Sequence, residues 1–92
     1  MNTDLVEEIN KLAQKVLAEF ESTNIYSYVK HVLEPFYEIS NLLQNEIIDK
    51  ELIIRNTYGI GYMVLDNYSF SRSKSGKEIL KLCKKIRNRV EV

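Results

Sequence analysis

The sequence predicts an all-α protein, an antiparallel four-helix bundle formed by a single domain over residues 1–92. Three observations lead to this prediction. Apolar residues recur at intervals of three and four along four segments, which is the spacing of one side of an α-helix. The 92 residues include one proline and three glycines, too few for the many turns of an all-β domain. The breaks between segments are short, and short connections make consecutive helices antiparallel neighbours.

The first two helices are expected over about Thr3 to Glu21 and about Tyr26 to Gln44. In the first, Thr3 is the expected N-cap, and acidic residues follow it near the positive end of the helix dipole. In the second, Pro35 lacks the N–H that would bond the His31 carbonyl, at a cost of about 3 kcal/mol unless the helix bends. We therefore expect a kink near His31–Pro35, or two short helices meeting there, and we interpret His31 as a solvated or kink-associated residue.

The third helix is expected over about Asp49 to Tyr68, with Asp49 as its N-cap. It carries two apolar stripes, one formed by Leu52, Ile53, Ile60, Met63 and Val64, and another formed by Ile54, Tyr58, Leu65 and Tyr68. A helix that is apolar on two sides is the most buried member of its bundle, or it shows one side to a partner. Gly59 and Gly61 each cost about 0.5–1 kcal/mol relative to alanine, and close approach of a neighbouring backbone would offset that cost. The segment lacks the third glycine and the strand of a phosphate-binding loop.

The fourth helix is expected over about Arg72 to Arg89. Ser71 is one candidate N-cap, and Ser75 with Glu78 forms a capping-box pattern that gives a competing start. Five apolar residues form a narrow stripe: Ile79, Leu82, Cys83, Ile86 and Val90. Five lysines fall on the opposite side: Lys74, Lys77, Lys81, Lys84 and Lys85. Because Cys83 lies on the apolar stripe, we expect a small core residue rather than a reactive thiol.

Charge divides along the chain although the net charge is zero. Residues 1–50 contain nine acidic and four basic residues, a net charge of −5, and residues 51–92 contain four acidic and nine basic residues, a net charge of +5. One interpretation is that the two halves attract each other within the bundle. The other is that the fourth helix offers a basic surface to an anionic partner.

Several classes of function are disfavoured by composition. A single cysteine cannot form a disulfide within the chain, and one histidine with one cysteine cannot supply the ligands of a structural zinc site. We therefore expect no metal and no cofactor. No base stands near a nucleophile in a recognisable pattern, so we expect no enzymatic activity and no small-molecule substrate. The acidic N-terminal stretch is unlike a signal peptide and no apolar run is long enough to span a membrane, so we expect a cytoplasmic location.

The five lysines also suggest an alternative function, a small nucleic-acid-binding regulator that uses the basic fourth helix. Lysines on one helix side can follow phosphates, but base reading favours Arg, Asn or Gln on that same side. Asn88 falls there, and Arg87 and Arg89 flank it. A solvated lysine face opposite a core stripe is common in bundles, so we do not expect nucleic acid to be the partner.

Three stretches resemble the immunity proteins of pediocin-like (class IIa) bacteriocins, of the enterocin A immunity type. They are YSYVKHVLEPFYEI in the second helix, ELIIRNTYGIGY in the third and NYSFSRSKSGKEILKLCKKI at the start of the fourth. The similarity extends over about residues 8–88 as a pattern of small matches. Pro35 departs from the family pattern, and family members commonly continue beyond the fourth helix, whereas this sequence ends at Val92.

The resemblance implies a small cytosolic four-helix bundle that protects a bacterium from a bacteriocin. Such proteins are thought to act at the membrane-embedded mannose phosphotransferase permease, the bacteriocin receptor, and their carboxyl-terminal half is associated with selectivity. Carried onto this chain, that indicates the surface from Arg72 to Val92. We expect a permease or its bacteriocin complex as partner, with peripheral contact to the anionic membrane surface. The expected partner-binding residues are the five lysines named above with Arg87 and Arg89, and three residues of the third helix, Ile54, Tyr58 and Tyr62. The alternative for the last three is that they complete the core.

Overall fold

A computed structural model describes residues 2–91, and in this range every regular element is a helix. The helices are α1 (Thr3–Phe20), α2 (Tyr26–Leu43), α3 (Lys50–Asp66), α4 (Tyr68–Arg72) and α5 (Lys74–Glu91). The predicted all-α class is therefore confirmed. The four predicted segments correspond to the four long helices, and the short α4 was not predicted. Within residues 2–91 no helix combines the length and the hydropathy required to cross a bilayer.

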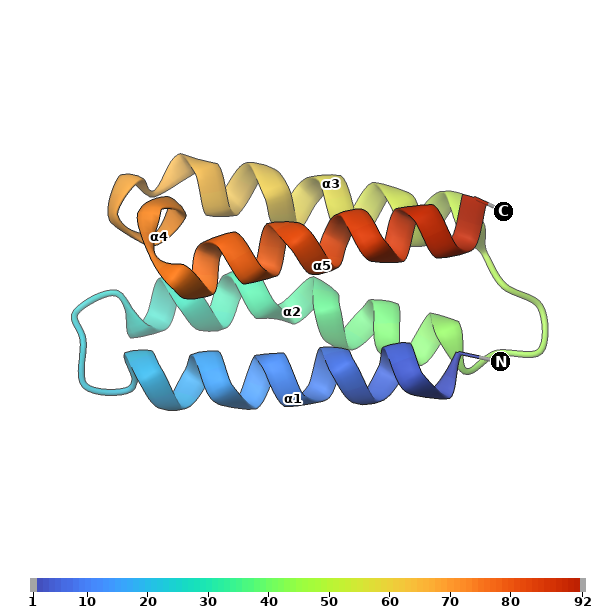
Figure 1. Ribbon diagram of the computed structural model, residues 1–92, viewed down its shortest axis with the longest axis horizontal. Helices are drawn as coiled ribbons and strands as arrows, with labels where there is room; N and C mark the ends of the chain where they lie inside the picture. Colours follow the sequence, from blue (N-terminus) through green and yellow to red (C-terminus); the bar gives the residue numbers. More distant parts are fainter. Residues whose placement is uncertain (1, 92) are drawn as a thin grey trace.

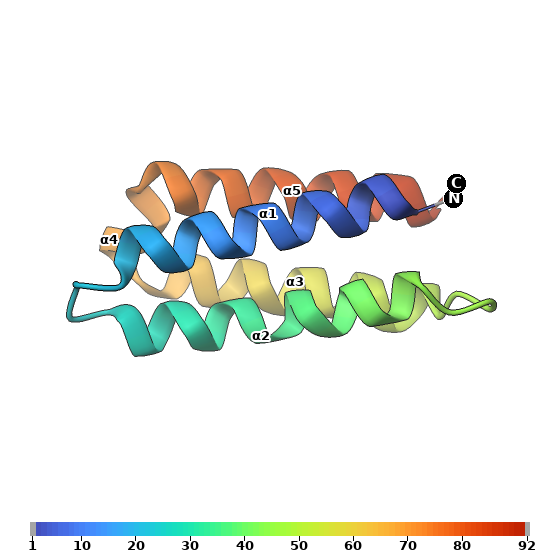
Figure 2. The same cartoon turned by 90° about the horizontal axis from the view of Figure 1, so that it is seen from below.

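The long helices lie side by side along the longest dimension of the molecule, which measures 39 × 20 × 17 Å. Figure 1 shows each long helix running opposite to the preceding one, so that the start of α1 and the end of α5 lie at the same end. The pairs α1/α2, α2/α3 and α3/α5 are in extensive contact, whereas α1 and α5 approach each other much less closely. The view from below places α5 beside α1 on one layer and α3 beside α2 on the other (Figure 2). The α1/α5 side is thus the least tightly closed side of the protein.

The core is formed by one side of each long helix together with Phe70 of α4. Leu5, Val29, Ile53 and Ile86 are fully buried examples from the four long helices. Phe70 is also fully buried and meets Phe20 edge to face, with ring centroids 5.2 Å apart. Full burial of one large apolar side chain contributes about 1.5–3 kcal/mol to the free energy of folding. This core is therefore the main source of the protein's stability. The short α4 therefore closes one end of the core.

The N-cap predicted for α3 is confirmed, whereas those predicted for α1 and α5 differ from the structure. The Asp49 side chain accepts a hydrogen bond from the Leu52 backbone N–H at 3.1 Å, so its predicted N-cap role is confirmed. Thr3 is the first residue of α1, and Asn2 precedes it as an N-cap that makes no side-chain capping bond.

Neither Ser71 nor Ser75 caps α5, because α4 occupies the segment where that helix was expected to begin. Ser73 performs this role, and its Oγ accepts from the Gly76 backbone N–H at 3.0 Å. The Ser71 hydroxyl donates to the Tyr68 carbonyl within α4. Ser75 is buried, and its hydroxyl donates to the Glu19 carboxylate of α1 at 2.6 Å.

Pro35 lies inside α2, which continues from Tyr26 to Leu43 as one helix. The alternative of two short helices meeting there is therefore wrong. His31, on the preceding turn, is solvated: its side chain is 67% exposed, and Nδ1 lies 3.9 Å from a carboxylate oxygen of Glu34. One turn before His31, the Tyr28 hydroxyl donates to the Met63 carbonyl and ties α2 to α3.

The explanation expected for the two glycines of α3 is wrong. A Cβ atom at Gly59 would meet nothing within 4 Å, and one at Gly61 would lie 3.8 Å from a methyl carbon of Leu80, which is ordinary contact. The close backbone approach occurs at Gly76, where a Cβ would lie 2.1 Å from the carbonyl oxygen of Phe70. The first turn of α5 thus packs against the backbone of α4, and only glycine fits there without movement.

Candidate interaction surface

The helix α5 lies between α1 and α3, and a groove runs along each of its two sides. The basic residues predicted to bind a partner are divided between these grooves and the solvent-facing side of α5. The two grooves differ in their charges, in their apolar lining and in how their walls are joined.

The α1/α5 groove is bridged by polar contacts in antiparallel order. They join Asp4 to Arg89 at 3.3 Å, Glu8 to Lys85 at 2.9 Å, Lys15 to Glu78 at 3.2 Å and Glu19 to Ser75 at 2.6 Å. All three ion pairs link α1 to α5, and in two of them, Asp4–Arg89 and Glu8–Lys85, the acid comes from the acidic half of the chain and the base from the basic half. The attraction between halves that the charge pattern indicated is therefore present on this side of the protein.

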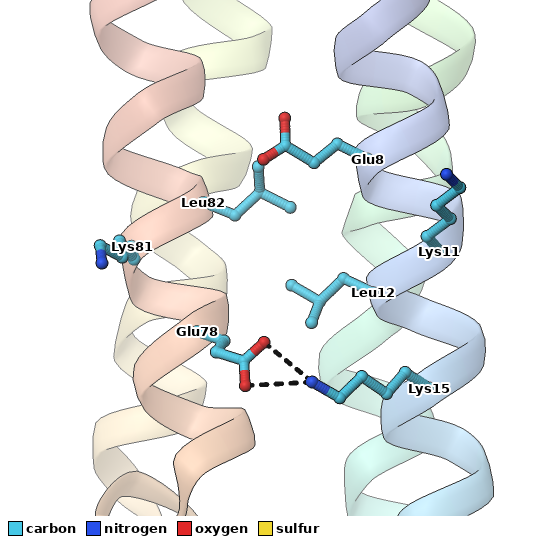
Figure 3. Close-up of a pocket in the computed structure, with 7 residues that line it drawn as sticks. All are labelled: Glu8, Lys11, Leu12, Lys15, Glu78, Lys81 and Leu82. Atoms are coloured by element: carbon cyan, nitrogen blue, oxygen red, sulfur yellow. Dashed lines mark hydrogen bonds and ion pairs between the residues drawn. The ribbon is translucent and has the colours of Figure 1, made fainter.

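Between these contacts the groove has an apolar floor. Figure 3 shows Leu12 of α1 and Leu82 of α5 facing each other, with the Lys15–Glu78 pair below them. Lys11 and Lys81 stand on the two rims and point away from each other (Figure 3). The space measures about 420 Å³ and is open to solvent.

The outermost bridge affects the ionisation of Asp4. The Arg89 guanidinium is hydrogen-bonded to the Asp4 carboxylate and lowers the pKa of that group below its ordinary value of 3.8. A guanidinium stabilises the ionised carboxylate through charge and through its paired N–H donors. Arg89 is thus engaged within the molecule at neutral pH.

The α3/α5 groove is lined by aromatic and basic side chains. Tyr58, Tyr62 and Leu65 of α3 form one wall, and their residues are 51%, 74% and 63% exposed. Leu80, Lys84 and Arg87 of α5 form the other wall. Gly61 and the buried Cys83 contribute to the lining, and the groove measures about 260 Å³. No carboxylate belongs to this lining, unlike that of the α1/α5 groove.

Arg87 is held in a defined position on this side. Its guanidinium carbon lies 4.4 Å from the centre of the Tyr58 ring, and Nη1 donates to the Thr57 hydroxyl oxygen at 3.2 Å. Thr57 is fully buried and its own hydroxyl donates to the Ile54 carbonyl at 2.7 Å. A guanidinium stacked on an aromatic ring and hydrogen-bonded at one edge keeps its remaining N–H groups free to meet an acceptor.

The cysteine in the floor of this groove is not a reactive thiol. Cys83 is 1% exposed, and burial raises the pKa of its thiol to about 12. Burial disfavours the thiolate, which is the nucleophilic form, and the nearby Arg87 charge offsets this effect only in part. The thiol is therefore protonated at neutral pH, in agreement with the core role expected from the sequence.

The predicted partner-binding residues fall into distinct groups. Lys84, Arg87, Tyr58 and Tyr62 are brought together in the α3/α5 groove. Lys85 and Arg89 are paired with α1, and Lys81 lines the α1/α5 groove. Lys74 and Lys77 are exposed and line neither groove.

Ile54, the remaining predicted contact, is partly buried and packs against the core. Leu65 and Leu80 line the α3/α5 groove although they were not singled out as contacts. The second apolar stripe of α3 already contained Leu65, whereas the position of Leu80 follows from how α5 packs on α3.

Residues 2–91 contain no cluster of three or more His, Cys, Asp or Glu side chains that could hold a metal ion. Comparison with protein-family models, with curated proteins and with solved structures finds no match to this chain. The candidate surface must therefore be interpreted from its own residues.

Proposed function

We propose that the protein is a bacteriocin immunity protein. It would protect a producing cell from a pediocin-like bacteriocin by binding, on the cytoplasmic side, at the toxin-engaged mannose phosphotransferase permease. Sequence resemblance over residues 8–88 suggests this class of protein. The observation that carries the proposal is the α3/α5 groove, where exposed tyrosines and unneutralised cations adjoin on the carboxyl-terminal half of the chain. Tyrosine and arginine are residue types that dominate protein interfaces.

In this proposal the protein acts by non-covalent obstruction. The long helices form an antiparallel four-helix bundle, with α2 bent at Pro35, and serve as a rigid support for the groove. Exposed lysines on α5, among them Lys74 and Lys77, lie near the anionic inner leaflet, where each contributes on the order of 1 kcal/mol of attraction. Neither an enzymatic step nor a cofactor is needed for this mode of action.

The test is protection of a sensitive strain. The protein is expressed in bacteria that carry the mannose permease, and the cells are challenged with a panel of pediocin-like bacteriocins. We expect survival against at least one of them, and a strain expressing no immunity protein gives the baseline. If expression at matched levels protects against none of the panel, the proposed function is wrong.

The nucleic-acid-binding alternative receives less support from the contacts of α5. Lys85 and Arg89 would have to release α1 carboxylates before they could contact phosphates. Binding through phosphate contacts weakens steeply as salt concentration rises. A titration with duplex DNA at low salt therefore separates the two functions, since salt-dependent binding with high affinity would favour the regulator.

A further inference from the structure

The α3/α5 groove has the dimensions and spacing of a surface that receives another helix. Its α3 wall presents Tyr58, Tyr62 and Leu65, at successive intervals of four and three residues. Its α5 wall presents Leu80, Lys84 and Arg87, also at intervals of four and three residues. Because α5 runs antiparallel to α3, the two rows follow the groove in opposite directions (Figure 1). Each row spans about 10.5 Å at 1.5 Å per residue. Two such rows form the ridges between which the side chains of a third helix pack.

The middle of the groove is open because one position has no side chain. Gly61 lies about one turn after Tyr58 and one turn before Leu65 on α3, and a Cβ placed there would meet only a methyl carbon of Leu80 at 3.8 Å. An incoming side chain can therefore approach the α3 backbone at this point. The large exposed fractions of Tyr62 and Leu65 indicate apolar surface that the chain itself leaves uncovered.

The charged residues of the groove indicate which kind of partner it would bind. Lys84 and Arg87 line it with no carboxylate among the lining residues, whereas the cations facing α1 are matched by Asp4 and Glu8. A second copy of the same groove would bring like charges together, which disfavours a symmetric pairing. A bilayer surface is flat and would touch the rims without filling the groove.

We propose that the α3/α5 groove binds an amphipathic helix of a partner protein, whose apolar side chains fill the groove and whose acidic side chains face Lys84 and Arg87. This inference rests on the proposed function in that both require action through contact with another protein. It adds the location of the contact and the chemistry of the partner segment.

The experiment uses two synthetic helical peptides of about 20 residues, a length that favours helix formation in water. Both carry leucines at alternating intervals of three and four, and the flanking positions are glutamate in one peptide and lysine in the other. Each is titrated into the full-length protein while backbone amide shifts are followed by NMR. We expect the acidic peptide to bind and to shift amides of α3 and α5 around Tyr62 and Lys84, and the basic peptide to bind at least about tenfold more weakly.

Two pairs of variants locate the contact. Y62A and K84E are each expected to weaken binding of the acidic peptide by about tenfold or more. Y37A and K30E are the matched controls, because Tyr37 is an exposed tyrosine of α2 and Lys30 an exposed lysine of the same helix, and neither lines either groove. Both controls are expected to bind as the unaltered protein does, and thermal unfolding monitored by circular dichroism checks that all four variants fold.

Several results would overturn the inference. They are the absence of amide shifts with the acidic peptide, equal binding of the two peptides, shifts centred on the α1/α5 groove, or self-association of the protein that Y62A abolishes. Binding to anionic lipid vesicles that depends on Tyr62, without peptide binding, would identify a membrane as the occupant instead.

The same variants in the protection assay separate this inference from the proposed function. Loss of protection in Y62A and K84E, with protection kept in Y37A and K30E, supports both. Protection that survives in all four variants rejects the groove and retains the function. If the unaltered protein protects against no bacteriocin but binds the acidic peptide in the groove, the function fails and the groove remains.

Discussion

The two sides of α5 use basic residues in opposite ways. Toward α1, Lys85 and Arg89 meet carboxylates of the same chain and help to hold two loosely packed helices together. Toward α3, where the helices pack closely, Arg87 stacks on Tyr58, Lys84 lines the same groove, and no carboxylate belongs to that lining. The comparison shows that a count of cations on a helix does not identify a binding surface. The informative property is which cations lack a neutralising partner and lie beside exposed apolar side chains.

The contacts that hold α5 in place also differ between its two sides. On the α3 side, α5 is fixed by the turn through α4 and by direct backbone contact at Gly76. On the α1 side, the bridging ion pairs join side chains that are between 32% and 62% exposed. Short-range packing tolerates little change, while exposed ion pairs contribute little individually. Mutations on the α3 side of α5 should therefore change the free energy of unfolding more than mutations on the α1 side.

The largest effect is expected at Gly76. In G76A the new methyl group would stand 2.1 Å from the Phe70 carbonyl oxygen, so α4 or the start of α5 must shift. Overpacking of this kind costs about 1–3 kcal/mol, measured as the loss in free energy of unfolding in urea. The matched control is G59A, where a Cβ meets nothing within 4 Å and alanine should stabilise the helix by about 0.5–1 kcal/mol. Equal stability of the two variants would show that the close contact at Gly76 carries no cost.

A smaller effect is expected at Thr57, which supports the α3/α5 groove from below. T57V keeps the side-chain shape but removes the hydroxyl that accepts from Arg87 and donates to the Ile54 carbonyl. Loss of such a hydrogen bond costs about 0.5–1.5 kcal/mol. Urea unfolding of T57V, R87M and the double variant gives the coupling between the two residues. If the two single losses simply add, Arg87 is held by Tyr58 alone.

The ion pairs across the α1/α5 groove should matter less than either change on the other side. K15Q and K85Q are each expected to lower the free energy of unfolding by about 0.2–1 kcal/mol, because the paired groups remain half-exposed. The loss should shrink in high salt, which screens exposed charges. K84Q is the comparison variant, because no carboxylate lines its groove, and it should leave stability nearly unchanged. A loss in K85Q that is as large in high salt as in low salt would contradict an electrostatic origin.

The sequence was sufficient to predict the helices but not how α5 begins. Repeats such as Leu5, Ile9 and Val16 report the buried side of a helix directly, because burial and helical period together determine the pattern. The local signals around Ser71 and Ser75 were ambiguous, since each serine can cap a helix. Packing of Phe70 into the core selects an extra turn, and Ser73 becomes the cap.

The candidate site was predictable in composition but not in arrangement. Tyr58 and Tyr62 could be assigned to a second side of α3 from spacing alone, and both are exposed. Helical spacing placed Lys84 and Lys85 on the same side of α5, yet they contact different neighbours. Adjacent residues on a helix are about 100° apart, so two lysines on one broad side can face opposite grooves. Which residue each cation contacts depends on how far apart the helices lie. That distance cannot be inferred from the periodicity of the sequence.

The smallest predicted effect is at the outer end of the α1/α5 groove and tests whether its ion pairs persist in solution. The hydrogen bond from Arg89 lowers the pKa of Asp4 in the folded protein below 3.8, so the ionised pair favours the folded state at neutral pH. That contribution is lost as the pH falls below 3.8 and through the lowered pKa, because the folded state then takes up the proton that the unfolded state already holds. In an NMR titration of the Asp4 carboxyl carbon, R89Q should raise the midpoint toward 3.8, whereas R72Q, which removes an arginine of α4 that stacks on Tyr68, should leave it unchanged. If Asp4 titrates identically in R89Q and in the unaltered protein, the outer bridge does not persist in solution, and Arg89 is then as available to a partner as Lys84 and Arg87 are on the other side of the helix.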